Sequence, residues 1–199
     1  YTVQLRYNDG TDAWFGGQVQ YDQKYFFPMP GYRYGYYCTG YNTKANGRGK
    51  TYKPLEYFKN LTSKKDGVVK LYMMWKKCSS AEMKYADKVI SLVNKERKKA
   101  GVPALTKNKD LTGAAQQRAT EIAKYFSHER MDGTMCFSIC SLMNGENIAK
   151  GQRSPEAVMK AWMNSPGHKA NILDESFTKI GVGCFKYNGS LHWVQCFGR

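Results

Sequence analysis

The hydrophobic pattern changes its period near residue 78, and this change limits the folds open to the chain. Between residues 1 and 77, aromatic and β-branched residues alternate with polar ones in short runs that glycines interrupt. That period of two is typical of strands in a half-buried sheet. After residue 78, apolar residues recur at spacings of three and four, as on one face of a helix. The sequence therefore predicts two domains: a small β-rich module and a larger, helix-containing one.

Helix start signals stand at three places in the second part. Ser79 precedes Glu82 by three residues, which is the spacing of a capping box. We expect Asp110 to cap the next helix, and Ser154 followed by Pro155 to begin a third. The three helices each carry an apolar stripe for packing on a common core.

The end of the chain, residues 177–199, predicts two strands joined by an Asn-Gly turn. Helices against an antiparallel sheet make an α+β layered domain. The run Ser165-Pro166-Gly167 indicates a sharp exit from the third helix that holds His168 in a defined place. His128 follows the second helix in the same way, so two imidazoles emerge at two helix ends.

The chain has six cysteines, an even number that suits a disulfide-bearing exported protein, although buried reduced thiols are the alternative. A zinc cluster is not indicated, because no two CxxC-like pairs occur. We expect Cys184 to pair with Cys196 on neighbouring strands, and Cys38 to pair with Cys78.

The formal net charge is +15, and both parts of the chain are basic. Such a diffuse excess attracts anionic partners in general, for example wall polymers or lipid headgroups. The dense run at residues 95–101 lies at an expected helix end, where cations complement the helix dipole. Nucleic acid is not expected as a partner, because no basic block interleaved with aromatic residues appears. No apolar run approaches the roughly 18 to 20 residues of a transmembrane helix.

The order of motifs in residues 1–77 resembles the internalin-type B repeat of bacterial surface proteins. An opening strand closed by Asn-Asp-Gly, a proline before Gly-Tyr, a Gly-Tyr-x-Thr step, a glycine-rich turn and a closing Leu-Tyr-x-x-Trp carry this resemblance. It implies a β-grasp-like spacer or adhesion module without chemistry of its own. Its many tyrosines either stack on a partner or fill a small sheet that lacks aliphatic residues.

Six ordered motifs in the second part resemble the CAP superfamily of cysteine-rich secretory proteins, antigen 5 and pathogenesis-related 1 proteins, in its bacterial extracellular branch. They are LVNKERKKAGVPAL, SHERMDGT, GENIAKG, AWMNSPGHKANIL, FTKIGVGCF and HWVQCFG. The resemblance implies an exported α/β/α sandwich with a cleft. The expected organisation is a module at 1–77, a linker at 78–83 and a CAP domain at 84–199.

The same resemblance implies a cleft with two histidines and two glutamates that holds a divalent metal in several members. His128, Glu146 and His168 match three of these positions, whereas Ser165 stands where the second glutamate is expected. Two imidazoles and one carboxylate are a ligand set that zinc accepts. Ser165 would either orient a histidine or a bound water, or cap a short turn.

The function that the resemblance favours is binding of an extracellular lipid, glycan or protein ligand at the cell surface. The alternative is a metal-assisted hydrolase of peptide, cell-wall or nucleic-acid substrates that uses the same cleft. A third alternative is an adhesin whose cleft has no role. A serine or cysteine nucleophile is not indicated, because Ser165 lacks a nucleophile-elbow motif and Cys136 is expected to be paired.

Overall fold

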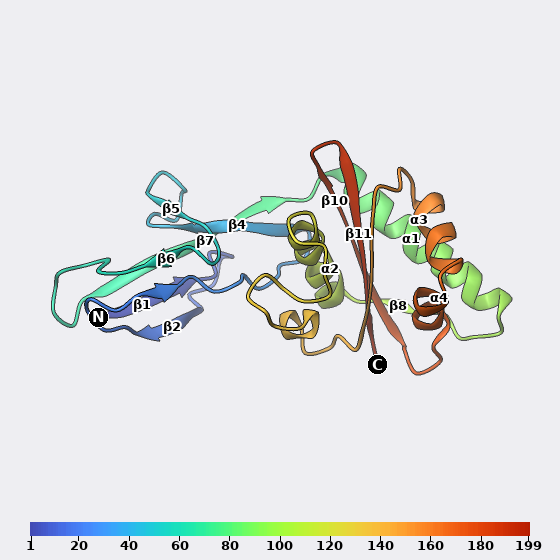
Figure 1. Ribbon diagram of the computed structural model, residues 1–199, viewed down its shortest axis with the longest axis horizontal. Coiled ribbons are helices and arrows are strands. Elements are labelled where there is room, and N and C mark those ends of the chain that lie inside the picture. Colours follow the sequence, from blue (N-terminus) through green and yellow to red (C-terminus); the bar gives the residue numbers. More distant parts are fainter. The chain divides into compact units, whose positions relative to one another are not determined.

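The computed structural model describes residues 1–199, which divide into two compact units. The first comprises residues Tyr1–Pro30 and Cys38–Lys76, and the second comprises Gly31–Tyr37 and Lys77–Arg199 (Figure 1). The short segment Gly31–Tyr37 thus belongs to the second unit although it interrupts the first in sequence. No helix of the chain combines the length and the apolar character that crossing a membrane requires.

The first unit is β-rich, with a five-stranded sheet in the order β2-β1-β7-β4-β5 and a two-stranded sheet of β3 and β6. The first and last strands, β1 and β7, lie parallel to each other, with Leu5 opposite Leu71. The strands are β1 (Thr2–Arg6), β2 (Trp14–Gln18), β3 (Tyr25–Phe26), β4 (Tyr36–Asn42), β5 (Thr51–Tyr52), β6 (Tyr57–Phe58) and β7 (Val68–Lys77).

Aromatic side chains fill the core of the first unit. Phe27 is fully buried, and its ring centroid lies 4.5 Å from that of Phe58 and 4.8 Å from that of Tyr52. Tyr41 is buried beside them, whereas Tyr21 and Tyr57 are exposed. Part of the tyrosine content therefore substitutes for aliphatic residues in a small sheet.

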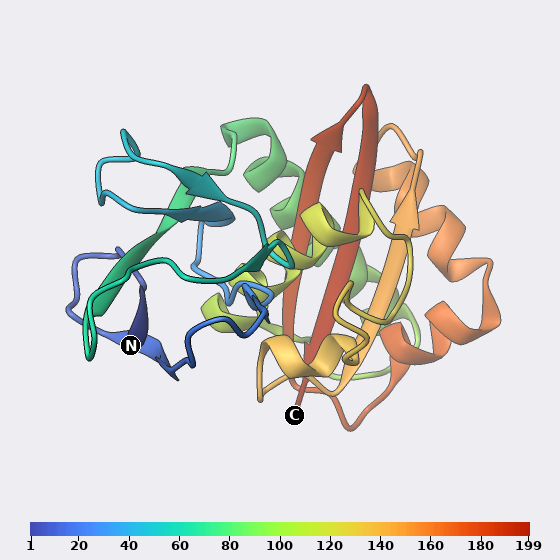
Figure 2. The same cartoon turned by 60° about the vertical axis from the view of Figure 1, so that its left-hand side comes forward.

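The second unit is built on one four-stranded sheet in the order β8-β10-β11-β9. Its strands are β8 (Thr106–Lys107), β9 (Gly145–Lys150), β10 (Lys179–Tyr187) and β11 (Ser190–Gly198). The predicted hairpin is confirmed, because Asn188 and Gly189 both have positive φ and join β10 to β11 as a two-residue turn. Strand β9 pairs with β11 alone and forms one edge of the sheet (Figure 2).

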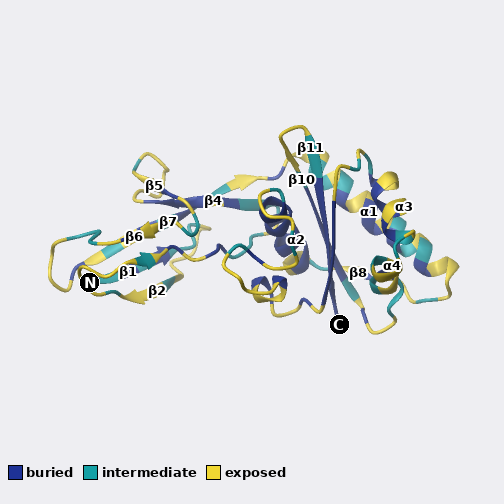
Figure 3. Cartoon of the chain, viewed as in Figure 1, coloured by how far each residue is buried: buried dark blue, intermediate teal, exposed yellow.

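Helices cover both faces of this sheet and make the predicted α/β/α sandwich, so the central strands are almost continuously buried (Figure 3). Helix α2 (Lys109–Ile122) and the 3-10 helix η1 (Cys136–Ile139) pack on one face. Helices α1 (Ser80–Lys99), α3 (Pro155–Met163) and α4 (Pro166–Leu173) pack on the other.

The helix starts follow the sequence signals with one exception. The capping box of Ser79 and Glu82 is formed at α1, and Ser154 caps α3 with a proline at the first position. Residues 80–83, which the sequence placed in a linker, form the first turn of α1. The predicted cap Asp110 is wrong, because Asn108 accepts the Leu111 N–H and caps α2 two residues earlier.

The Ser-Pro-Gly run does not only end a helix. Helix α3 stops at Met163, and Pro166 is the first residue of α4. A proline suits that place because the first N–H groups of a helix have no intrahelical acceptor. His168 consequently lies in the first turn of a new helix, which corrects its predicted place on a turn beyond α3.

The expected disulfides are wrong, because all six cysteines are free thiols. Cys184 and Cys196 do lie on neighbouring strands, but Cys184 is opposite Trp193, three residues from Cys196. Their side chains also point to opposite faces, one into the layer of α1 and α3 and the other into the layer of α2. Cys38 lies in the core of the first unit, whereas Cys78 belongs to the second.

Two glycines let α2 lie directly on the sheet. A Cβ atom on Gly181 would overlap the backbone of Leu111 and Thr112, and one on Gly183 would overlap the backbone of Ala115. Both glycines are on β10, two residues apart, so they face α2 from the same side of the sheet. The close approach depends on the missing side chains.

We predict that Gly181→Ala lowers the free energy of unfolding of the second unit by about 3 kcal/mol, because α2 must move away from the sheet. Gly167→Ala is the control, since a Cβ atom at this position in the first turn of α4 meets nothing within 4 Å. Urea unfolding of both variants checks this. A Gly181→Ala protein as stable as the wild type would contradict the close packing.

Candidate functional site

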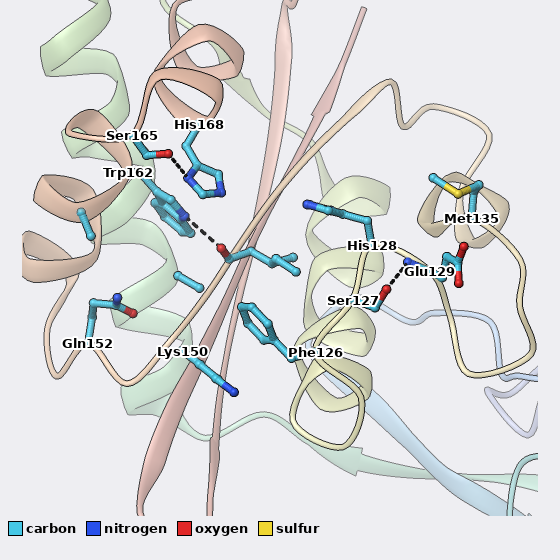
Figure 4. A pocket seen from close by; sticks show the side chains of 13 residues that line it. Phe126, Ser127, His128, Glu129, Met135, Lys150, Gln152, Trp162, Ser165 and His168 are labelled. Carbon is cyan, nitrogen blue, oxygen red and sulfur yellow. Dashed lines mark hydrogen bonds between the residues drawn. The ribbon is translucent and has the colours of Figure 1, made fainter.

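A cleft of about 790 Å³ opens beside the edge strand β9. Figure 4 shows β9 crossing it, with the segment after α2 on one side and the α3–α4 region on the other. His128 and His168 reach into it from these opposite sides. The other residues that line it are Phe126, Ser127, Glu129, Met135, Ile148, Ala149, Lys150, Gln152, Ala161, Trp162 and Ser165.

His168 is held by its own helix start. Ser165 is the N-cap residue of α4, and its Oγ lies 2.9 Å from His168 Nδ1. The pair is three residues apart, as in a capping interaction, but here the hydroxyl contacts the imidazole and not a backbone N–H. Of the roles considered for Ser165, this contact supports orientation of a histidine. Nε2 of His168 makes no hydrogen bond to another group of the protein.

Side-chain amides fix α4 against β9. Asn147 Nδ2 donates to the His168 carbonyl at 3.0 Å and to Gln195 Oε1 at 2.9 Å. Asn171 Nδ2 donates to Asn147 Oδ1 at 2.9 Å. Asn147 and Gln195 are fully buried. This amide network sets the height of His168 above the sheet, and no local pattern in the sequence indicated it.

Glu146 is a buried ion-pair partner. Its Oε1 accepts from Arg118 Nε at 2.8 Å, and its Oε2 accepts from Arg118 Nη2 at 3.4 Å. His128 Nδ1 lies 2.8 Å from the same Oε2. An ionised carboxylate only accepts, so Nδ1 carries the proton and Nε2 is left facing the cleft as the free nitrogen. Glu146 therefore positions His128.

The same Arg118 also binds Glu121, whose Oε2 is 2.8 Å from Nη1. Arg130 donates to Glu121 from Nη2 at 2.7 Å and from Nε at 3.1 Å. Two arginines and two glutamates, all buried, thus balance one another in charge. Burial alone would lower the pKa of Arg118, but Glu146 and Glu121 outweigh it and raise the pKa above its ordinary value.

Cys136 completes a group that no motif in the sequence indicated. Donor atoms of His128, Cys136 and Glu146 lie within 4.8 Å of one another, and His168 is not in this group. Burial, followed by the charge of Glu146, raises the pKa of the Cys136 thiol to about 12. The thiol is therefore protonated near neutral pH and is a poor nucleophile.

Comparison with known proteins identifies the fold. The model of the CAP family, described as the cysteine-rich secretory protein family, matches residues 90–197. The chain belongs to this family. Over 121 residues it is 42% identical to the uncharacterized protein YkwD of Bacillus subtilis, covering 57% of this chain and 46% of that protein.

Two solved structures are similar in fold to this chain. One is an extracellular protein containing a SCP domain from Bacillus anthracis, at 25% identity and a TM-score of 0.53, covering 64% of this chain and 46% of that one. The other is an outer surface protein of Borrelia burgdorferi, at 22% identity and a TM-score of 0.51, covering 61% of this chain and 95% of that one. The chain spans less than half the length of both Bacillus proteins.

The donor set of this CAP domain does not fit a zinc ion as it stands. Both Glu146 oxygens already accept from Arg118 or His128, and a metal would have to displace the guanidinium. Arg118 is fully buried and would keep only Glu121 as a charged partner. Ser165 supplies a hydroxyl where a carboxylate ligand is expected, and that hydroxyl contacts His168. Zinc on His128, Glu146 and His168 stays a prediction.

We predict that Arg118→Met lowers the free energy of unfolding of the CAP domain by about 3–5 kcal/mol, because it leaves the buried Glu146 carboxylate without its arginine partner and removes one of the two arginines that bond to Glu121. Adding Glu146→Gln to this variant should recover part of the loss. Urea unfolding of both singles and the double gives the coupling. If the two losses simply add, the pair is not coupled and the assigned role is wrong.

His168 and His192 should both titrate below the ordinary histidine value of 6.5. Burial is the first cause for each; His128 lowers the pKa of His168 further, and Lys150 that of His192. His192 lies in β11, is buried and does not line the cleft. A folded-state pKa below the unfolded value means that the unfolded chain binds more protons as the pH falls. Stability is therefore full above pH 6.5 and declines below it.

Proton NMR titration of the three imidazoles measures this directly, with urea unfolding between pH 5 and 8 as the second readout. His192→Gln should show a shallower loss of stability on acidification. A His168 resonance that titrates at or above 6.5 would contradict the described burial of its ring.

Proposed function

We propose that this chain is an exported, surface-associated bacterial protein whose CAP domain binds an extracellular ligand in the cleft beside β9. The similarity to the extracellular SCP-domain protein of Bacillus anthracis supports a place outside the cell. The basic charge of +15 supports an anionic wall polymer, lipid headgroup or host protein surface as the partner.

One observation carries the choice of binding over turnover: the only buried carboxylate that touches a cleft histidine is already neutralised. Both oxygens of Glu146 already accept hydrogen bonds, from Arg118 and His128, and its charge is compensated by Arg118. Meanwhile the cleft presents apolar side chains to solvent, since Phe126 is 43% and Met135 is 49% exposed. Exposed apolar groups around a few fixed polar groups are typical of a binding site.

The first unit is proposed as a B-repeat-like spacer or adhesion module. Its sheet has parallel first and last strands, and it exposes Trp14, Tyr21 and Phe26. Exposed aromatic rings are suited to sugar or protein surfaces. The group of potential metal ligands described above, His128, Cys136 and Glu146, lies outside this unit.

The metal-assisted hydrolase stays the alternative, with His128, Glu146 and His168 as its ligands. It requires Glu146 to exchange Arg118 for a metal. Nothing in the described geometry favours that exchange.

The cleft proposal predicts that Phe126→Asp weakens ligand binding at least tenfold, because it places a carboxylate among the apolar lining residues. Tyr125→Asp is the matched control: Tyr125 is adjacent and 47% exposed, but it does not line the cleft. Calorimetry with a panel of wall-glycan fragments, anionic lipid vesicles and peptides provides the measurement.

Three results bear on the proposal. Loss of binding in Phe126→Asp with retention in Tyr125→Asp supports it. Equal loss in both variants, or no binding across all three ligand classes, would overturn it.

A further inference from the structure

The backbone of β9 has one edge that no other strand covers. In the hairpin, the turn at Asn188-Gly189 makes Tyr187 and Ser190 a hydrogen-bonded pair, so the even-numbered residues of β11 bond to β10. The odd-numbered residues of β11 therefore bond to β9, as the Gly151 N–H to Leu191 carbonyl bond of 2.9 Å confirms. The backbone N–H and carbonyl groups of Glu146, Ile148 and Lys150 consequently point away from β11, toward the uncovered edge of the sheet.

Side chains close part of this edge. Asn171 Nδ2 donates to the Glu146 carbonyl at 3.3 Å, and Trp162 Nε1 donates to the Ile148 carbonyl at 3.3 Å. The N–H of Ile148 and both the N–H and the carbonyl of Lys150 bond to no other group of the protein. These two residues also line the cleft, whereas Glu146 does not. The open part of the edge is therefore the floor of the binding site.

The open groups have the spacing of a strand partner. Residues 148 and 150 are two apart, so their outward groups repeat at about 6.8 Å along the strand. An extended peptide presents N–H and carbonyl groups at the same repeat, whereas acyl chains and sugar rings do not. Edge strands with unpaired N–H and carbonyl groups are templates for strand addition.

The walls of the cleft suit the side chains of such a peptide. A strand lying along β9 points successive side chains in opposite directions. One direction leads to Phe126, Met135 and His128, and the other leads to Trp162 and the start of α4 at Ser165 (Figure 4). The cleft lining carries one lysine, Lys150, and one glutamate, Glu129, so the preference for a peptide with acidic residues rests on the net charge of +15 of the chain.

We propose that the ligand of the CAP cleft is an extended, net-acidic peptide that adds to β9 as a fifth strand, bonding to the Ile148 N–H and to the N–H and carbonyl of Lys150. This inference rests on the proposed binding function and names the class of its ligand. It gives Lys150 a role through its backbone, which no property of its side chain indicates.

Lys150→Pro tests the inference on the full chain. Proline removes the outward N–H of residue 150 and leaves the bonds to β11 in place, because those belong to Ala149 and Gly151. Lys150→Ala is the matched control, since it removes the ammonium group and keeps the N–H. The probe is a heptapeptide selected from a random phage-displayed library on the wild-type chain, then synthesised with a fluorophore and measured by fluorescence polarisation.

We expect Lys150→Pro to weaken peptide binding at least tenfold and Lys150→Ala to weaken it less than threefold. Methylating the alternate backbone nitrogens of the peptide should abolish its binding to the wild type, a test that needs no protein variant. Equal binding of the methylated and unmethylated peptides, or equal affinity of Lys150→Pro and the wild type, overturns the inference.

The failure of this inference is distinguishable from failure of the binding function. If no peptide is selected, but a glycan or lipid binds in a manner sensitive to Phe126→Asp, the cleft binds a ligand of another class and strand addition is wrong. If no class of probe binds, the proposed function itself fails. If Lys150→Pro unfolds, as circular dichroism would show, the methylated peptide decides alone.

Discussion

The buried ion pairs of Arg118 hold together the parts of the CAP domain that make its cleft. The guanidinium bonds to Glu121 on its own helix, to Glu146 on the edge strand and to the Ser127 carbonyl. Removing any charge of this set would leave another one buried without compensation, and that cost keeps the segments in place. His128 takes its position from Glu146 and so indirectly from Arg118.

The two walls of the cleft are fixed by different physical means. Ion pairs hold the wall that carries His128, whereas the amides of Asn147, Asn171 and Gln195 hold the wall that carries His168. Between them β9 is left as an uncovered sheet edge. The two walls of the cleft are thus held by hydrogen bonds to buried side chains, and backbone groups of β9 lie between them.

Sequence signals that span only a few residues predicted the local structure well. The capping box at Ser79, the Ser154 cap and the Asn-Gly hairpin depend on bonds between residues at most four positions apart, and all three are confirmed. The cap at Asp110 was wrong because Asn108 is an equally good acceptor nearby and starts α2 first. The basic run at 95–101 predicted only a charged helix end. Arg97, which belongs to that run, is instead fully buried and donates to four backbone carbonyls outside its helix.

Periodicity, a local property of the chain, was enough to predict an α+β second unit. The α/β/α class and the three candidate residues His128, Glu146 and His168 came from the resemblance of the ordered motifs to the CAP superfamily. Only the packed fold shows that Cys184 and Cys196 point to opposite faces of the sheet, that Glu146 pairs with Arg118, and that Cys136 lies beside His128. These outcomes depend on which faces of the sheet the side chains share and on which charges are buried together. The spacing of residues along the chain predicts neither of these two properties.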